Sequence, residues 1–291
     1  MSANSSSNSS LKPPTDDCLE ITNSLFMSTA LCLAYLLLLP LFILVLYMGY
    51  RRRRKRPAAS ATSHSDVFTF HMVSLELISF LGSCFYSYGV YTSQDVMTVL
   101  GGKAFSIISP GQTLFHLLTC VERYLAVVHP VTYLGLRQAG GVRIRNICIG
   151  CVWLMSFATV GLAMYRNFAT VPYFLFFGVC FLVVSFLSIS VLCVLIRPGP
   201  GEVGGNRDHI DQSKQRAFYT ILAIMGTLFA RFLSALVFGG LSFTSVLNIC
   251  DKRFIMWSTA WFYLPSSLVL PLLFLHRAGK LPGCKHNTES V

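Results

Sequence analysis

The sequence predicts an all-α membrane protein, a seven-transmembrane helix bundle whose N-terminus lies outside the cell. Its 291 residues are 54% hydrophobic and 12% charged, with a mean hydropathy of +0.60, whereas an ordinary soluble domain is about 25% charged. The apolar residues gather into runs long enough for a helix to cross a bilayer. The basic residues fall mainly in alternate loops between those runs, and that alternation gives the orientation.

The expected spans follow one another along nearly the whole chain. Each offers about the 20 apolar residues that the hydrocarbon core requires. They are residues 25–50, 66–91, 103–129, 146–165, 171–196, 215–240 and 254–276. We expect residues 1–24 to form a flexible extracellular tail and residues 277–291 a short cytoplasmic tail, since both are polar and end at a span.

The charges of the loops orient the bundle. With the N-terminus outside, sixteen lysines and arginines lie in the inner loops and C-terminal tail, and five lie in the outer segments. Such an excess marks the cytoplasmic side. The run RRRRKR at residues 51–56 directly follows a span, so we interpret it as an anchor that meets anionic membrane lipid, not as a nuclear localisation signal. The net charge of +11 therefore does not indicate nucleic-acid binding.

The outer segments and the tail carry candidate modification sites. The N-terminus lacks the basic region of a cleavable signal peptide, and Asn4 and Asn8 both fit the N-glycosylation pattern. Cys18 and Cys250 fall on the oxidising outer side, where they form either a bridge or two unpaired thiols. Cys284, in the basic tail, is either a palmitoylation site or a plain free cysteine. The seven cysteines inside spans are interpreted as small apolar packing residues.

Four ionisable residues inside the spans are functional candidates, because each costs roughly 2.5–3.5 kcal/mol to insert. Glu122 and Arg123 adjoin near the inner end of the third span, where they act as interfacial anchors or point in different directions. Arg231 lies in the middle of the sixth span and should face a cavity, pair with an acid or touch an anionic ligand group. Glu76 lies in the second span. His116, like His71, is expected to be a hydrogen-bonded core histidine.

The stretch ERYLAVVHPVTY, residues 122–133, resembles the end of the third span of rhodopsin-like G-protein-coupled receptors, with their E/D-R-Y motif. Further matches follow in order along the chain. Trp153 stands where that family has a fourth-span tryptophan, and Glu76 stands at the acidic position of the second span. Pro271 and Phe274, in LVLPLLF, are similar to the proline and aromatic residue of the NPxxY motif.

The resemblance implies a switch at the inner end of the bundle. In that family an agonist in the outer cavity favours a state in which the sixth span swings outward, and a heterotrimeric G protein docks in the opened crevice. By resemblance Arg123 is the docking contact, Glu122 is its partner in the resting state, and Tyr124 completes the motif. Pro130 and Tyr133 would shape the inner loop that meets the G protein. This is a two-state equilibrium biased by a ligand.

The chain also departs from the family pattern. Leu270 replaces the asparagine of NPxxY and Phe274 replaces its tyrosine, and the sixth span has Arg231 but no Trp-x-Pro. Glu76, in place of the usual aspartate, is either a sodium ligand, as the resemblance implies, or a protonated glutamate bonded to a neighbour. Pro271 is either part of the switch or a plain structural kink. These departures keep open a receptor-like decoy, chaperone or partner subunit without coupling.

Other function classes have less support. The chain has no HExxH, GxSxG or glycine-rich phosphate motif, so we expect neither an enzyme nor a cofactor or metal. A carrier or channel is favoured by Glu76 and Arg231 but opposed by the lack of an internal repeat. The expected partners are a heterotrimeric G protein, an unknown extracellular ligand and membrane lipid. The ending TESV could also meet a PDZ domain. The expected location is the plasma membrane.

Overall fold

The computed structural model describes residues 14–55, 64–136, 138–163, 170–196, 207–243 and 258–277, and within these ranges it contains helices and no β-strand. The helices are α1 (Pro14–Lys55), α2 (His64–Tyr91), α3 (Asp95–Ser106), α4 (Ile108–Val128), α5 (Pro130–Leu136), α6 (Ala139–Ala163), α7 (Thr170–Ile196), α8 (Arg207–Phe243) and α10 (Tyr263–Arg277). The predicted all-α class is therefore confirmed for the part of the chain that is described.

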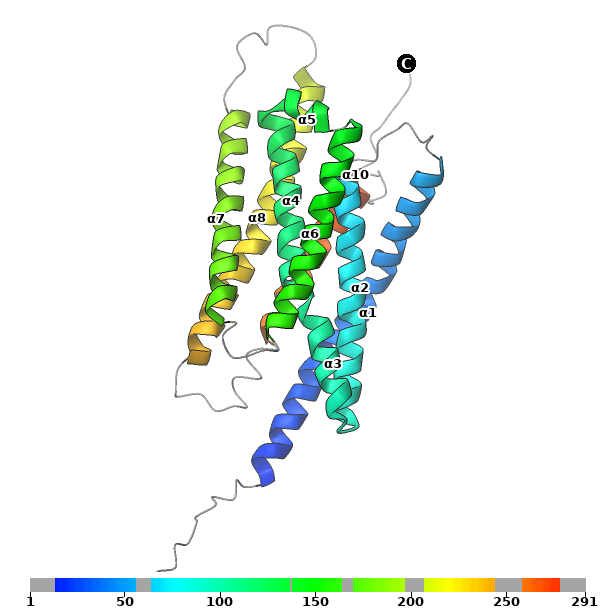
Figure 1. The fold of residues 1–291 in the computed structure, drawn as a ribbon, viewed down its shortest axis with the longest axis vertical. Helices are drawn as coiled ribbons and strands as arrows, with labels where there is room; N and C mark the ends of the chain where they lie inside the picture. The colour runs from blue at the N-terminus through cyan, green and yellow to red at the C-terminus, as the bar shows by residue number, and fades with distance from the viewer. Residues whose placement is uncertain are drawn as a thin grey trace, which may run out of the picture.

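The long helices run side by side along one axis (Figure 1). The helix α1 starts at the end of the bundle where α3 lies, and α10 runs up to the opposite end, where α5 lies. Among the described residues, six helices are long and apolar enough to cross a membrane, and α8 adds a shorter apolar stretch, Ile221–Val237. The chain is thus a multi-pass membrane protein.

Two elements differ from the expected spans. The first helix begins at Pro14, so residues 14–24, expected as part of a flexible tail, are helical. The third span is divided into α3 and α4 around Ile107. Pro110 lies in the first turn of α4, and because proline has no N–H, it cannot continue the hydrogen-bond ladder of a preceding helix. The proline therefore accounts for the break.

Glycines bring α2 and α3 into backbone contact. A Cβ atom on Gly82 would lie 2.6 Å from the backbone nitrogen of Phe105, and one on Gly101 would lie 2.3 Å from that of Tyr86. These separations are far below van der Waals contact, so no side chain fits at either glycine. Small residues at helix interfaces allow this close approach in membranes. The α2–α3 pair is thereby fixed as a unit at the end of the bundle where α1 begins.

The helix α4 is the central element. It contacts α2, α6, α7, α8 and α10, and its Phe115 is fully buried in an apolar cluster with Met72, Leu75, Ile224 and Leu270 from other helices. Side chains at helical spacing along α4 therefore meet most of the bundle. Any polar group on that helix has to find a partner inside the protein, because lipid offers none.

Candidate functional site

A buried polar network crosses the middle of the bundle, centred on Gln112 of α4. The amide nitrogen of Gln112 donates hydrogen bonds to the carboxylate of Glu76 on α2 and to the hydroxyl of Ser267 on α10, the latter at 2.8 Å. Its amide oxygen accepts a hydrogen bond from Arg231 on α8 at 3.1 Å. Glu76, Gln112 and Ser267 are 0% exposed and Arg231 is 3% exposed. One amide thus joins an acidic, a basic and a hydroxyl side chain from three other helices.

The guanidinium of Arg231 has further partners. It donates a hydrogen bond to the backbone carbonyl of Ser109 at 3.1 Å. Its central carbon lies 4.4 Å from the ring centroid of Tyr263 and 5.6 Å from that of Phe177. Aromatic faces attract a cation by their quadrupole, most strongly where water is excluded. Arg231 therefore ties α8 to α4 and α10, and it reaches the buried carboxylate through the amide of Gln112.

The network explains how two ionisable side chains are tolerated in an apolar bundle. Burying a charge is costly unless it is hydrogen-bonded and compensated, and the dipole of Gln112 serves both Glu76 and Arg231. A second link between α4 and α10 lies close by, since the ring nitrogen Nε2 of His116 is hydrogen-bonded to Ser266 at 2.8 Å. His116 is 0% exposed, which confirms the prediction of a hydrogen-bonded core histidine.

Sequence reasoning missed the residue at the centre of this network. Ser109, Gln112 and His116 follow one another at spacings of three and four, and such residues share one face of a helix. This polar stripe in an otherwise apolar span was the pattern that could have indicated a buried polar network. Ser266 and Ser267 carried no comparable pattern, and only the packing of α10 against α4 brings them to the stripe.

The C-terminal end of α4 is shaped by His129 and Pro130. The ring of a proline disfavours helical backbone at the preceding residue, and His129 takes φ −128° and ψ 66° as the C-cap of α4. Pro130 then starts α5, where a missing N–H costs nothing. Tyr124 stays at the corner, with its ring centroid 5.6 Å from that of His129. The HP pair thus turns the chain so that α5 folds back beside α4.

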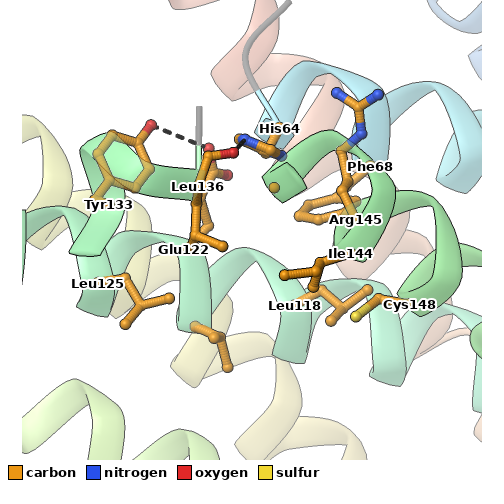
Figure 2. Close-up of a pocket in the computed structure, with 12 residues that line it drawn as sticks. His64, Phe68, Leu118, Glu122, Leu125, Tyr133, Leu136, Ile144, Arg145 and Cys148 are labelled. Atoms are coloured by element: carbon orange, nitrogen blue, oxygen red, sulfur yellow. Dashed lines mark hydrogen bonds between the residues drawn. The ribbon is translucent and has the colours of Figure 1, made fainter. Parts of the chain in front are cut away.

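Glu122 faces the helix that follows the turn. The hydroxyl of Tyr133 on α5 donates a hydrogen bond to the Glu122 carboxylate at 3.4 Å (Figure 2). Glu122 is 7% exposed, whereas Arg123 is half-buried. The Nε atom of Arg123 is buried and has no hydrogen-bond partner within the described part of the chain. The two adjacent residues therefore have different surroundings.

The α5 segment is tied to α2 and α6 as well. The ring of His64, the first residue of α2, donates a hydrogen bond to the backbone carbonyl of Leu136 at 3.0 Å (Figure 2). A Cβ atom on Gly141 would lie 1.9 Å from that same carbonyl oxygen, so α5 and α6 meet there in backbone contact. A pocket of about 130 Å³ lies between α2, α4, α5 and α6. It is lined by His64, Phe68, Leu118, Val121, Glu122, Leu125, Tyr133, Leu136, Gly141, Ile144, Arg145 and Cys148.

The C-terminal end of α10 lies at the same end of the bundle as α5. Pro271 lies inside α10 and is buried, and Phe274 is 1% exposed. The ring of Phe274 packs edge-on against Phe70, with centroids 5.5 Å apart, and the guanidinium of Arg52 lies 5.1 Å from its centroid. Arg52 also lies 3.9 Å from the carboxylate of Asp66. Helices α1, α2 and α10 are joined there by an aromatic pair and a cation.

Several candidate residues lie beyond what the structure describes. Asn4, Asn8, Cys250 and Cys284 fall outside the described residues, and Cys18 is described only as part of the backbone of α1. The glycosylation, disulfide and palmitoylation hypotheses therefore stay predictions. Within the described ranges, no group of three or more His, Cys, Asp or Glu residues is placed to hold a metal ion.

Comparison with known proteins adds no family. The chain matches no protein-family model, and no curated protein matches it in sequence. The residues from which a function can be inferred form two groups, the buried network around Gln112 and the C-terminal end of α4.

Proposed function

We propose that the protein is a seven-span G-protein-coupled receptor of the rhodopsin-like class, with its N-terminus outside the plasma membrane. It would transmit the binding of an unknown extracellular ligand to a heterotrimeric G protein. The proposal includes the seventh crossing, made by α8, whose apolar stretch Ile221–Val237 is flanked by helix on both sides.

The observation that carries the proposal is the position of Arg123. This arginine lies near the inner end of α4, the helix that contacts α2, α6, α7, α8 and α10. Its neighbour Glu122 accepts a hydrogen bond from Tyr133 of α5. The residues that the resemblance assigns to coupling therefore lie beside α5, the segment that the resemblance assigns to contact with a G protein. Arg123 is half-buried and its Nε atom is buried, so a change in helix packing at this end of α4 would change the surroundings of its charge.

The buried network supplies a restraint for the resting state. Outward motion of α8 would pull Arg231 away from Gln112 and from the carbonyl of Ser109. Those hydrogen bonds hold α8 against α4, so they favour the closed arrangement. A ligand that binds the open arrangement more tightly would shift the equilibrium by the difference between its two affinities.

The test is basal guanine-nucleotide exchange, measured in cells across a panel of G-protein α subunits. The parent chain is compared with Arg123→Ala and with Glu122→Gln, which removes the negative charge beside the arginine. Arg143→Ala is the matched control, because Arg143 is an exposed arginine on α6. All chains are compared at equal surface level.

We expect exchange above background in the parent chain or in Glu122→Gln. It should disappear when Arg123→Ala is added and persist when Arg143→Ala is added. No exchange from any of these chains at equal surface level, with every α subunit, would contradict the proposal.

The second candidate is a receptor-like partner or decoy that does not couple. It is favoured by Phe274, which lacks the hydroxyl of the NPxxY tyrosine and is buried against Phe70 and Arg52. Capture of an extracellular ligand by surface-expressed protein, with no exchange in the panel, would support this candidate. Ion current or solute uptake that depends on Glu76 would instead favour a carrier or channel.

A further inference from the structure

Two cysteines meet where α1 packs against α2. The sulfur of Cys32 lies 3.1 Å from the sulfur of Cys84, although the residues are 52 positions apart in the chain. Both are free thiols in the structure, and neither is fully buried. The sequence indicated small apolar packing residues at both positions. The contact between the sulfur atoms gives them a chemistry that packing residues lack.

The two thiols lie at matching depth. Cys32 is seven residues after the start of its membrane span at Leu25, and Cys84 is seven residues before the end of its span at Tyr91. At 1.5 Å per residue both lie about 10 Å inside their candidate spans, although the helix α1 itself begins earlier, at Pro14. The helices are consecutive and run in opposite directions, so the pairing is in register rather than a contact at a frayed end.

We propose that Cys32 and Cys84 form a redox site that closes to a disulfide within the membrane, with hydrogen peroxide as the two-electron oxidant. A disulfide needs the sulfur atoms at about 2.05 Å, so the two sulfur atoms must approach by about 1 Å. Peroxide is small and uncharged, and neither thiol is fully buried, so the proposal needs no opening of the bundle for peroxide to reach them.

The reaction balances without a further reactant. One thiol attacks the O–O bond of the peroxide and becomes a sulfenic acid, and one water leaves. The second thiol attacks the sulfenic sulfur, the S–S bond forms, and a second water leaves. The two sulfur atoms lose one electron each, the peroxide oxygens gain both, and the two thiol hydrogens end in water. A cellular dithiol would reverse the step by thiol–disulfide exchange.

The bond would act on a helix with few other ties. Among the described helices, α1 has its main contacts with α2 and α10 only. A covalent link to α2 would fix α1 near one end of the bundle, while Arg52 holds it to Asp66 and Phe274 near the other. The redox site is independent of G-protein coupling, so its presence or absence is decided separately from the proposed function.

The test places a protease site between residues 56 and 63, which connect α1 to α2 in the chain. The full-length protein carries Cys18→Ser, so that a bridge from Cys18 cannot produce the same result. It is purified in lipid nanodiscs, treated with peroxide, cleaved, blocked with an alkylating reagent and run on a gel without reductant. Matched chains carry Cys32→Ser, Cys84→Ser or, as the control, Cys148→Ser on α6.

We expect the α1 fragment to stay attached to the rest of the chain until reductant is added. The Cys148→Ser control should behave in the same way, whereas Cys32→Ser and Cys84→Ser should release the fragment in every condition. Peptide mapping should find the Cys32 and Cys84 peptides joined, with two hydrogen atoms lost. Release of the fragment from the parent chain after peroxide, with both cysteines recovered as alkylated thiols, would overturn the proposal.

Discussion

Arg231 donates a hydrogen bond to the amide oxygen of Gln112, 3.1 Å away and 119 residues earlier in the chain. The amide nitrogen of Gln112 donates to Glu76 and Ser267, so the amide has one orientation that allows hydrogen bonds to all three neighbours. A side chain held in that way links α8 to α2 and α10. The network is therefore the first place to test for the stability of the bundle.

Removing one member of this network should destabilise the protein. We expect Arg231→Met to cost about 3–5 kcal/mol of unfolding free energy, because it leaves the Glu76 carboxylate buried without its opposite charge. Thermal unfolding in detergent micelles measures the loss. The double variant Glu76→Gln, Arg231→Met removes both charges and should recover most of it. A double variant less stable than Arg231→Met would show that the two charges do not compensate each other.

The glycine contact between α2 and α3 should not tolerate a methyl group. Gly101→Ala places a carbon 2.3 Å from the backbone nitrogen of Tyr86, and overpacking of this kind costs about 1–3 kcal/mol. Gly161→Ala on α6 is the control, since a Cβ atom there meets nothing within 4 Å. Melting temperatures of the two variants in one detergent decide the matter, and equal values would count against backbone contact of α2 with α3.

The cation over Phe274 should contribute measurable coupling. A double-mutant cycle with Arg52→Gln and Phe274→Leu should give an interaction free energy of about 0.5–1 kcal/mol, the range for a cation–π pair near the surface. Loss of the Arg52–Asp66 contact is common to both sides of the cycle and cancels. The same cycle with Arg54→Gln, an exposed arginine two residues further along α1, should give no coupling. Comparable coupling from both arginines would rule out a specific contact.

The proposed topology predicts that the two termini lie on opposite sides of the membrane. An epitope tag at the N-terminus should bind antibody on intact cells, and a tag after Val291 should bind only after permeabilisation. That result requires an odd number of crossings, and so a crossing by α8 in addition to the six candidate spans. Accessibility of both tags on intact cells would instead require an even number.

The contact of Tyr133 with Glu122 should restrain coupling, if the proposed function holds. Tyr133→Phe removes one hydrogen bond of 3.4 Å, a bond worth at most about 1 kcal/mol at that length. Basal guanine-nucleotide exchange should therefore rise by no more than about fivefold. Tyr50→Phe, at an exposed tyrosine on α1, serves as the control. A fall in exchange would mean that Tyr133 supports the active state instead.

The sequence was sufficient for what depends on composition along the chain. A long apolar run has to be helical in lipid, because every backbone N–H and C=O needs a partner within the segment. The helical class and the membrane location follow from that rule alone. The same rule marked Glu76, Glu122, Arg123 and Arg231 as unusual, since each has a cost in hydrocarbon that an ordinary packing residue does not.

Hydropathy could not place the break at Ile107 or the early start at Pro14. Both depend on single prolines and on contacts between helices. A hydropathy value averaged over about twenty residues does not detect either of them. The start of α5 was open to prediction, because a proline restricts the residue before it, and His129 ends α4 as that rule requires.

The sequence by itself determined that the chain is a multi-pass helical membrane protein and which of its residues are costly to bury. Only the tertiary structure decided what compensates that cost. Gln112 stands between Glu76 and Arg231, and the Cys32 and Cys84 sulfur atoms touch, because separate helices meet at those points. Which residue becomes the partner of another 52 or 119 positions away depends on how the helices pack and rotate against each other. The local sequence pattern of a single helix does not determine that packing or rotation.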